Sequence, residues 1–111
     1  MRKVEKPWGY EEIWAETEKY VGKIITILPK NRLSLQYHEI KEESIYVLSG
    51  TLRVWDSNNE ASYTDHNKGS VYHVKPGQVH RFGAAYGITK ILEVSTTELD
   101  DVVRLADDYK R

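Results

Sequence analysis

Short apolar runs constrain the fold of this chain more than any other feature. Most are about four to eight residues long and are bounded by Gly, Pro, Asn or Asp. Such runs are short for helices but suit strands, and the bounding residues favour tight turns. We therefore predict strands over residues 10–15, 20–28, 33–38, 44–49, 51–55, 61–64, 70–74, 80–83 and 89–95.

Many short strands in one chain predict an all-β domain. A barrel or jelly roll protects its sheet edges better than an open sheet does, so we prefer that architecture. Only the tail, residues 97–111, has helix-like features: Thr97 or Asp100 would cap one short helical turn that packs through Val102, Val103 and Leu105. Because no linker interrupts the 111 residues, we expect residues 1–111 to form a single domain.

The composition limits the chemistry and the partners of the chain. It contains no cysteine, so a metal site would have to use histidine, carboxylate or amide oxygen ligands. Its 16 basic and 17 acidic residues are mixed along the chain, which argues against an electrostatic nucleic-acid surface. No apolar run is long enough for a signal peptide or a membrane span. We expect a cytoplasmic protein without nucleic-acid or membrane partners.

Four polar residues suggest a metal site. In an extended segment 33–38, Gln36 and His38 project from the same face, while Glu43 precedes the next strand and His80 opens a later one. Mixed nitrogen and oxygen ligands suit zinc, iron, manganese, cobalt or nickel, and two histidines with one carboxylate also match the facial triad of iron oxygenases. From the residues alone the metal signal is weak, and we favour hydrogen-bonded structural histidines and a solvated acidic turn.

Two segments resemble the paired motifs of the cupin superfamily. The first motif runs Gly, a short gap, His-x-His, a gap, Glu, six residues, Gly, and here six residues separate Glu43 from Gly50. The second motif ends in Pro-x-Gly-x-x-His, and "GSVYHVKPGQVHRF" at residues 69–82 resembles it with the proline one place later. The phrases "KPWGYEEI", "NRLSLQYH", "YVLSGTLRV", "LEVST" and "DDVVRLADDYKR" further resemble the mannose-6-phosphate isomerase cupin domain, which also ends bifunctional mannose-1-phosphate guanylyltransferases.

The resemblance implies a double-stranded β-helix barrel with a central divalent metal, zinc foremost, and with iron, manganese, cobalt and nickel as alternatives. It implies metal ligation by His38, Glu43 and His80, with Gln36 as an oxygen ligand. Ile40 stands where we place the second motif histidine, and an apolar side chain cannot bind metal, so the site either keeps Gln36, His38, Glu43 and His80 or has lost the ion. Because no nucleotidyltransferase segment precedes the domain here, we do not expect a complete guanylyltransferase.

The implied activity is the interconversion of mannose 6-phosphate and fructose 6-phosphate, and cupins often form homodimers, which we also expect here. Isomerisation through an enediol needs a base, for which Glu93 is the first candidate and Glu39 the second. Glu93 alternates with Leu92 and Val94, so it faces solvent if those two pack between sheets and the interior if they do not.

Binding of the sugar phosphate also requires a positively charged side chain. Strand alternation places Arg32 on the face of Gln36 and His38, and Lys30 lies nearby in a turn, so these two are the candidates for phosphate binding. Two other functions fit the same residues: a non-catalytic sugar-binding cupin and an iron-dependent cupin oxygenase.

Overall fold

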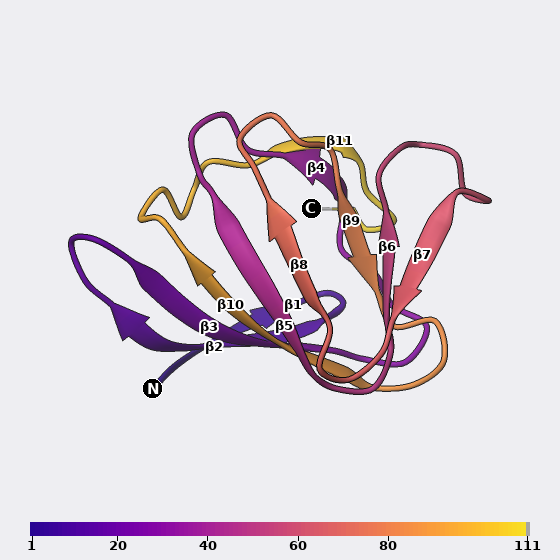
Figure 1. Ribbon diagram of the computed structural model, residues 1–111, viewed down its shortest axis with the longest axis horizontal. Coiled ribbons are helices and arrows are strands. Elements are labelled where there is room, and N and C mark those ends of the chain that lie inside the picture. The colour runs from indigo at the N-terminus through magenta and orange to yellow at the C-terminus, as the bar shows by residue number, and fades with distance from the viewer. Residues whose placement is uncertain (111) are drawn as a thin grey trace.

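The computed structural model describes residues 1–110, and these residues form strands and turns without a helix. The all-β prediction is therefore confirmed. The strands are β1 (Arg2–Lys6), β2 (Gly9–Glu16), β3 (Val21–Ile27), β4 (Leu35–Tyr37), β5 (Glu43–Ser49), β6 (Leu52–Trp55), β7 (Tyr63–His66), β8 (Val71–Val74), β9 (Arg81–Gly83), β10 (Thr89–Ser95) and β11 (Val103–Ala106) (Figure 1). Within the described residues there is accordingly no helix that could cross a membrane.

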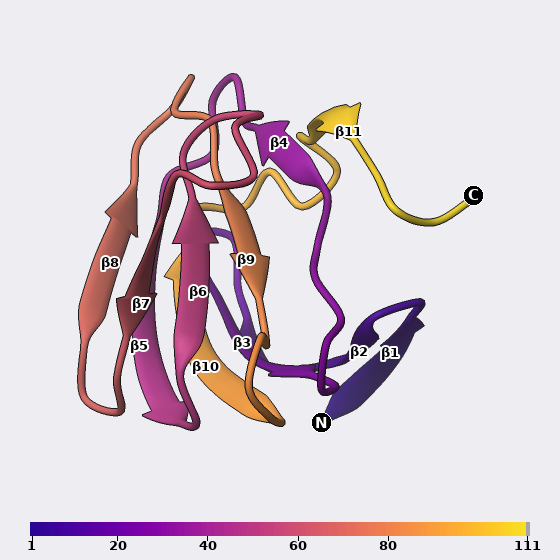
Figure 2. The ribbon, with the colours of Figure 1, turned by 90° about the vertical axis from the view of Figure 1, so that its right-hand side faces the viewer.

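The strands form two facing antiparallel layers. One is a six-stranded sheet in the order β1-β2-β3-β10-β5-β8, and the other combines the sheets β7-β6-β9 and β11-β4. Reciprocal backbone hydrogen bonds between Gln36 and His80, at 2.9 and 3.0 Å, join β4 to the chain just before β9. In Figure 2 the β7-β6-β9 layer overlaps the six-stranded sheet, and β11 and β4 lie at the same end of the molecule. This arrangement is the expected jelly-roll barrel.

The two layers enclose one apolar core. Ile27, Ile45 and Ile91 from the six-stranded sheet face Leu52 and Phe82 from the other layer, and all five are buried. Their burial supplies the main driving force for closing the barrel, since the stabilisation scales with the apolar area removed from water.

Most predicted strands are present with ends shifted by one or two residues, but the tail prediction is wrong. Residues 97–102 form turns and extended chain, and Val103–Ala106 pairs as β11 with β4, placing Val103 opposite Tyr37. A strand here satisfies backbone groups of β4 that would otherwise lie at a sheet edge, and a helical turn could not do so. The sequence analysis also missed β1, whose segment "RKVEK" is mostly charged.

The burial pattern of strand β10 shows whether Glu93 faces solvent or the interior of the barrel. Ile91, Glu93 and Ser95 are buried, whereas Leu92 is half-buried and Val94 is exposed. Glu93 therefore points into the barrel and Leu92 and Val94 point outward. A carboxylate in the interior requires partners, which the site next to it provides.

Candidate functional site

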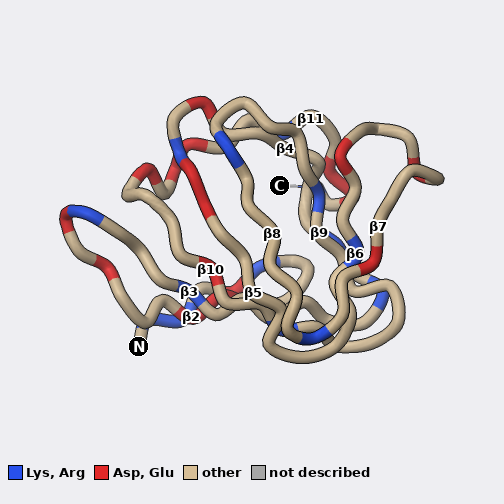
Figure 3. The backbone as a smooth tube through the Cα atoms, in the orientation of Figure 1, with Lys and Arg blue, Asp and Glu red and all other residues tan. Residues whose placement is uncertain are grey.

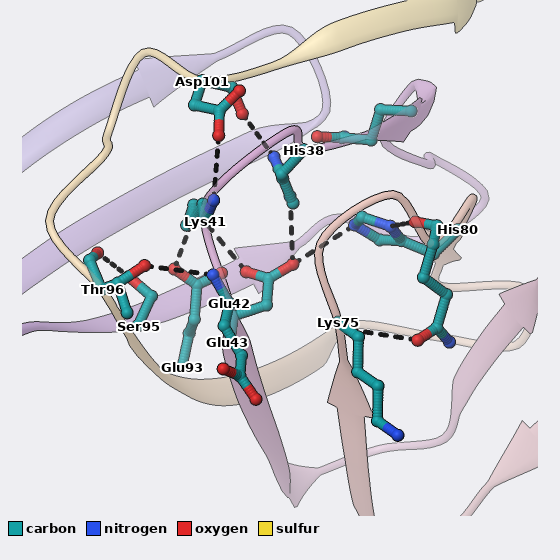
Figure 4. Close-up of polar contacts among 12 residues, drawn as sticks. His38, Lys41, Glu42, Glu43, Lys75, His80, Glu93, Ser95, Thr96 and Asp101 are labelled. Carbon is teal, nitrogen blue, oxygen red and sulfur yellow. Dashed lines mark hydrogen bonds and ion pairs between the residues drawn. The ribbon is translucent and has the colours of Figure 1, made fainter.

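Residues from three separate segments converge inside one end of the barrel. His38 follows β4, Glu43 opens β5 and His80 precedes β9. The Nε2 atoms of His38 and His80 lie 3.3 and 3.2 Å from the same Oε1 atom of Glu43, and all three side chains are buried (Figure 4). One donor atom from each residue lies within 4.8 Å of the others, a spacing that suits a shared cation.

The second nitrogen of each histidine ring fixes its tautomer. His38 Nδ1 lies 2.5 Å from the backbone oxygen of Asp101, and His80 Nδ1 lies 3.0 Å from the backbone oxygen of Gln78. A carbonyl oxygen only accepts, so each Nδ1 carries the proton and donates it. A neutral ring then directs a lone pair at Nε2 toward the Glu43 carboxylate.

Three electron-rich atoms facing one another repel unless a cation lies between them. The donor set therefore fits a divalent metal, because backbone carbonyls hold ligating histidines in this way in known metal sites. Zinc, iron, manganese, cobalt and nickel all accept two imidazoles and a carboxylate, so the ligands leave the identity of the metal open.

Gln36 offers a fourth ligand. Its amide nitrogen lies 3.1 Å from the Ser34 hydroxyl and 3.4 Å from the Ser34 carbonyl oxygen, so its amide oxygen is the end available for a cation. Gln36 and His38 are two residues apart and line the same cavity, so their spacing matches that of the two histidines in the His-x-His motif. Our assignment of Ile40 to the second position is wrong, because its side chain is 67 % exposed on the loop after β4 and is not among the residues that line the cavity.

A buried ionic group adjoins the histidines. Lys41 Nζ lies 3.5 Å from Glu43 Oε2 and 3.5 Å from Glu93 Oε2, and all three residues are buried. Burial raises the pKa of Glu93, and the negative charge of Glu43 raises it further. Burial also acts to raise the pKa of Glu43, but its contacts with Glu93 and the two histidines, together with the charge of Lys41, hold that pKa well below its usual value. Glu43 is thus ionised, as a metal ligand must be.

These residues line a cavity of about 240 Å³ that lies between the two layers. Glu93 and Lys41 share it with the three candidate ligands and Gln36, and Trp8 and Phe82 contribute apolar wall. The volume lies somewhat below the range typical of drug-sized ligands, so the cavity suits a molecule the size of a monosaccharide.

The structure does not bring the predicted phosphate-binding residues into this cavity. The Arg32 guanidinium donates to Glu60 and to Asp108 at 2.6–3.0 Å, and these carboxylates raise its pKa. The expected alternation fails because the chain leaves strand geometry between Arg32 and β4, so that residues 33 and 34 both line the cavity. Lys30 is exposed in a turn at φ 63°. Glu39, the second candidate base, is exposed on the loop that carries Ile40.

Asp101, which was not among the predicted site residues, connects the tail to the site. Its carboxylate accepts the backbone N–H groups of Glu39, Ile40 and Lys41 at 3.1, 2.7 and 2.9 Å, and its backbone oxygen accepts from His38. The backbone hydrogen bonds lower the pKa of the Asp101 carboxyl. Nothing near Asp101 in the sequence signals this role, because its partners lie about sixty residues earlier.

Comparisons with known proteins agree with the fold and with the family suggested by the motifs. The profile of the family "Mannose-6-phosphate isomerase C-terminal" matches residues 1–107. The mannose-1-phosphate guanylyltransferase ManC of Salmonella typhimurium is 36% identical over 114 residues, which cover 99% of this chain and 23% of that protein. The chain thus spans about a quarter of the length of this relative.

Two solved structures show the same fold at low sequence identity. A Klebsiella pneumoniae protein with a double-stranded beta-helix domain superposes with a TM-score of 0.74 at 19% identity, covering 88% of this chain and 84% of that one. A sugar phosphate isomerase of the cupin superfamily from Silicibacter pomeroyi superposes with a TM-score of 0.61 at 21% identity, covering 70% of this chain and 50% of that one.

Proposed function

Because the chain belongs to the mannose-6-phosphate isomerase C-terminal family, we propose that it is a metal-dependent isomerase that interconverts mannose 6-phosphate and fructose 6-phosphate. The observation that carries the proposal is the buried convergence of His38, Glu43 and His80 beside a second buried carboxyl, Glu93, in one cavity. A structural histidine pair would require neither the converging lone pairs nor the open space next to them.

The ligand set we propose is His38, Glu43 and His80 with the amide oxygen of Gln36, and zinc is the ion we expect. A divalent cation held there would supply Lewis-acid stabilisation of negative charge on the sugar oxygens. Isomerisation moves a proton between C2 and C1 of the sugar through an enediol, so a base must accept the proton from one carbon and return it to the other.

We assign the proton transfer to Glu93 rather than to Glu39. Glu93 is only 4 % exposed and lines the cavity. Its Oε2 atom has no hydrogen-bond partner among residues 1–110, and Lys41 Nζ lies 3.5 Å from it. The burial that raises its pKa makes the ionised carboxylate a stronger base than an exposed one. Lys41 holds this carboxylate in place and offsets the charge of Glu43.

The test is a coupled assay of mannose 6-phosphate conversion with purified protein supplied with each candidate metal. We expect turnover that a chelator abolishes and that metal restores. His80→Ala should abolish turnover, whereas His73→Ala should retain it, because His73 is exposed, contacts Ser44 and is not among the residues that line the cavity. Full turnover in metal-free protein would exclude the metal role. Sugar-phosphate binding without turnover would favour the sugar-binding alternative, and oxygen consumption with Fe²⁺ the oxygenase alternative.

A further inference from the structure

The cavity that holds the candidate metal ligands also contains four basic side chains, two of which are neutralised. Lys23 pairs with Glu11 at 3.2 Å, and Lys41 lies between Glu43 and Glu93. The other two, Lys6 on β1 and Arg104 on β11, have no ion-pair partner among residues 1–110. Basic and acidic residues are otherwise interspersed over the molecule (Figure 3), so two unpaired cations in one small cavity stand out.

Strand register places Arg104 beside the candidate metal ligands. Arg104 lies directly opposite Gln36 in the β11–β4 pair, and Gln36 lies opposite His80 in the bridge toward β9. Directly opposed residues of antiparallel strands project from the same face, with their Cβ atoms about 5 Å apart. Arg104, Gln36 and His80 therefore form one row across the wall of the cavity, with Arg104 exposed at its outer end and His80 buried at its inner end.

Lys6 approaches the same cavity from the other layer. It ends β1 and is half-buried, and it lines the cavity together with the buried Trp8. β1 belongs to the six-stranded sheet and β11 to the opposite layer, so the two cations flank the cavity from both sides. Figure 2 shows β1 and β11 at the same side of the molecule, away from the β8 edge.

From these positions we propose that Lys6 and Arg104 form an anion subsite at the mouth of the cavity that binds the phosphate group of a phosphorylated sugar. An arginine offers two parallel N–H donors to phosphate oxygens and a lysine adds a mobile positive charge. The row from Arg104 to His80 then orients the sugar, with its phosphate outside and its carbonyl end at the candidate metal centre. This inference rests on the proposed function for the choice of ligand, and it replaces Arg32 and Lys30 as the phosphate-binding residues.

The test uses sorbitol 6-phosphate, which carries a phosphate but no carbonyl to isomerise, so that binding is measured apart from turnover. Calorimetric titrations of the Zn²⁺-supplied protein should show that Lys6→Gln and Arg104→Gln each weaken binding by about tenfold or more. Lys19→Gln is the matched control, because it removes one positive charge from an exposed turn outside the cavity. Unphosphorylated sorbitol should bind the wild type and all variants equally weakly.

Several outcomes would overturn the subsite. These are wild-type affinity in both variants, the same affinity for sorbitol and its 6-phosphate, or a loss of affinity in Arg32→Gln alone. Circular dichroism and thermal melts establish that each variant folds. If sorbitol 6-phosphate binding follows the expected pattern but mannose 6-phosphate is not turned over, the isomerase proposal fails and the subsite stands. If both variants turn over mannose 6-phosphate with an unchanged KM, the isomerase proposal stands and the subsite fails.

Discussion

At the residue scale, Glu93 shows how one side chain can favour function at the expense of stability. Its carboxyl is buried beside the ionised Glu43, and one of its oxygens lacks a hydrogen bond. Burying a carboxyl under these conditions costs free energy, since it must either stay protonated or carry charge in a poorly solvated place. A protein selected for stability alone would place an apolar residue here, as β10 does at Ile91.

The raised pKa of Glu93 leads to a prediction on pH and stability in the metal-free protein. The folded-state pKa lies above the ordinary value of 4.5, so the folded protein holds this proton more tightly than the unfolded chain does. The stabilisation of the folded state that comes from this proton is therefore fully present below pH 4.5 and is lost as the pH rises through the folded-state pKa. Glu93→Gln removes this loss. The free energy of unfolding of the variant should therefore rise relative to that of the wild type as the pH increases, by at most about 1.4 kcal/mol per pH unit.

Urea denaturation of the EDTA-treated proteins between about pH 5 and pH 9 measures this difference. Glu18→Gln, which removes an exposed carboxylate, serves as the control and should follow the wild type. A constant difference in the free energy of unfolding between Glu93→Gln and the wild type across this range would contradict the raised pKa of Glu93.

In the metal-supplied enzyme the same Glu93→Gln substitution should reduce kcat by about a hundredfold or more if Glu93 transfers the proton.

At the scale of elements, the sequence predicted those strands whose signal is local. The segment Thr89–Ser95 was predicted with its correct bounds, because "TKILEVS" alternates in a strand period and both its neighbours pair with it. β1 and β11 are edge strands with charged, half-exposed sequences, and each becomes a strand only because a partner accepts its hydrogen bonds. Such pairing depends on contacts between distant segments, which no local pattern shows.

The tail also acts as a support for the site, which gives a second prediction. Asp101 fixes the loop at residues 39–41 through its carboxylate and fixes His38 through its backbone oxygen. Asp101→Ala should free the loop that leads from His38 to Glu43, and metal affinity should fall by about tenfold, as when groups supporting metal ligands are lost. Competition with a metal-binding dye measures the affinity, and Asp56→Ala, at an exposed acid far along the chain, is the control. Unchanged affinity in Asp101→Ala would show that the loop holds its shape without the carboxylate.

At the scale of the whole molecule, the candidate site joins the two layers of the barrel. His38 and His80 belong to the layer of β4 and β9, whereas Glu43 and Glu93 belong to the six-stranded sheet. Strand alternation and the resemblance to the cupin motifs together predicted Gln36, His38, Glu43 and His80 as one group. They failed for Arg32, because a short break before β4 shifts the alternation, and they missed Arg104, whose position depends on the pairing of β11. The homodimer expected from the resemblance stays a prediction.

A metal that bridges the layers should stabilise the folded barrel. Binding to the folded state alone adds about 2.7 kcal/mol when free metal exceeds Kd a hundredfold, which for a domain of this size raises Tm on the order of 10 °C. Differential scanning calorimetry with Zn²⁺ and with EDTA should show this shift in the wild type and no shift in His80→Ala. His73→Ala, with its exposed imidazole, should keep the full shift. If His80→Ala gains as much from Zn²⁺ as the wild type does, the metal binds elsewhere, and the buried histidines have only a structural role.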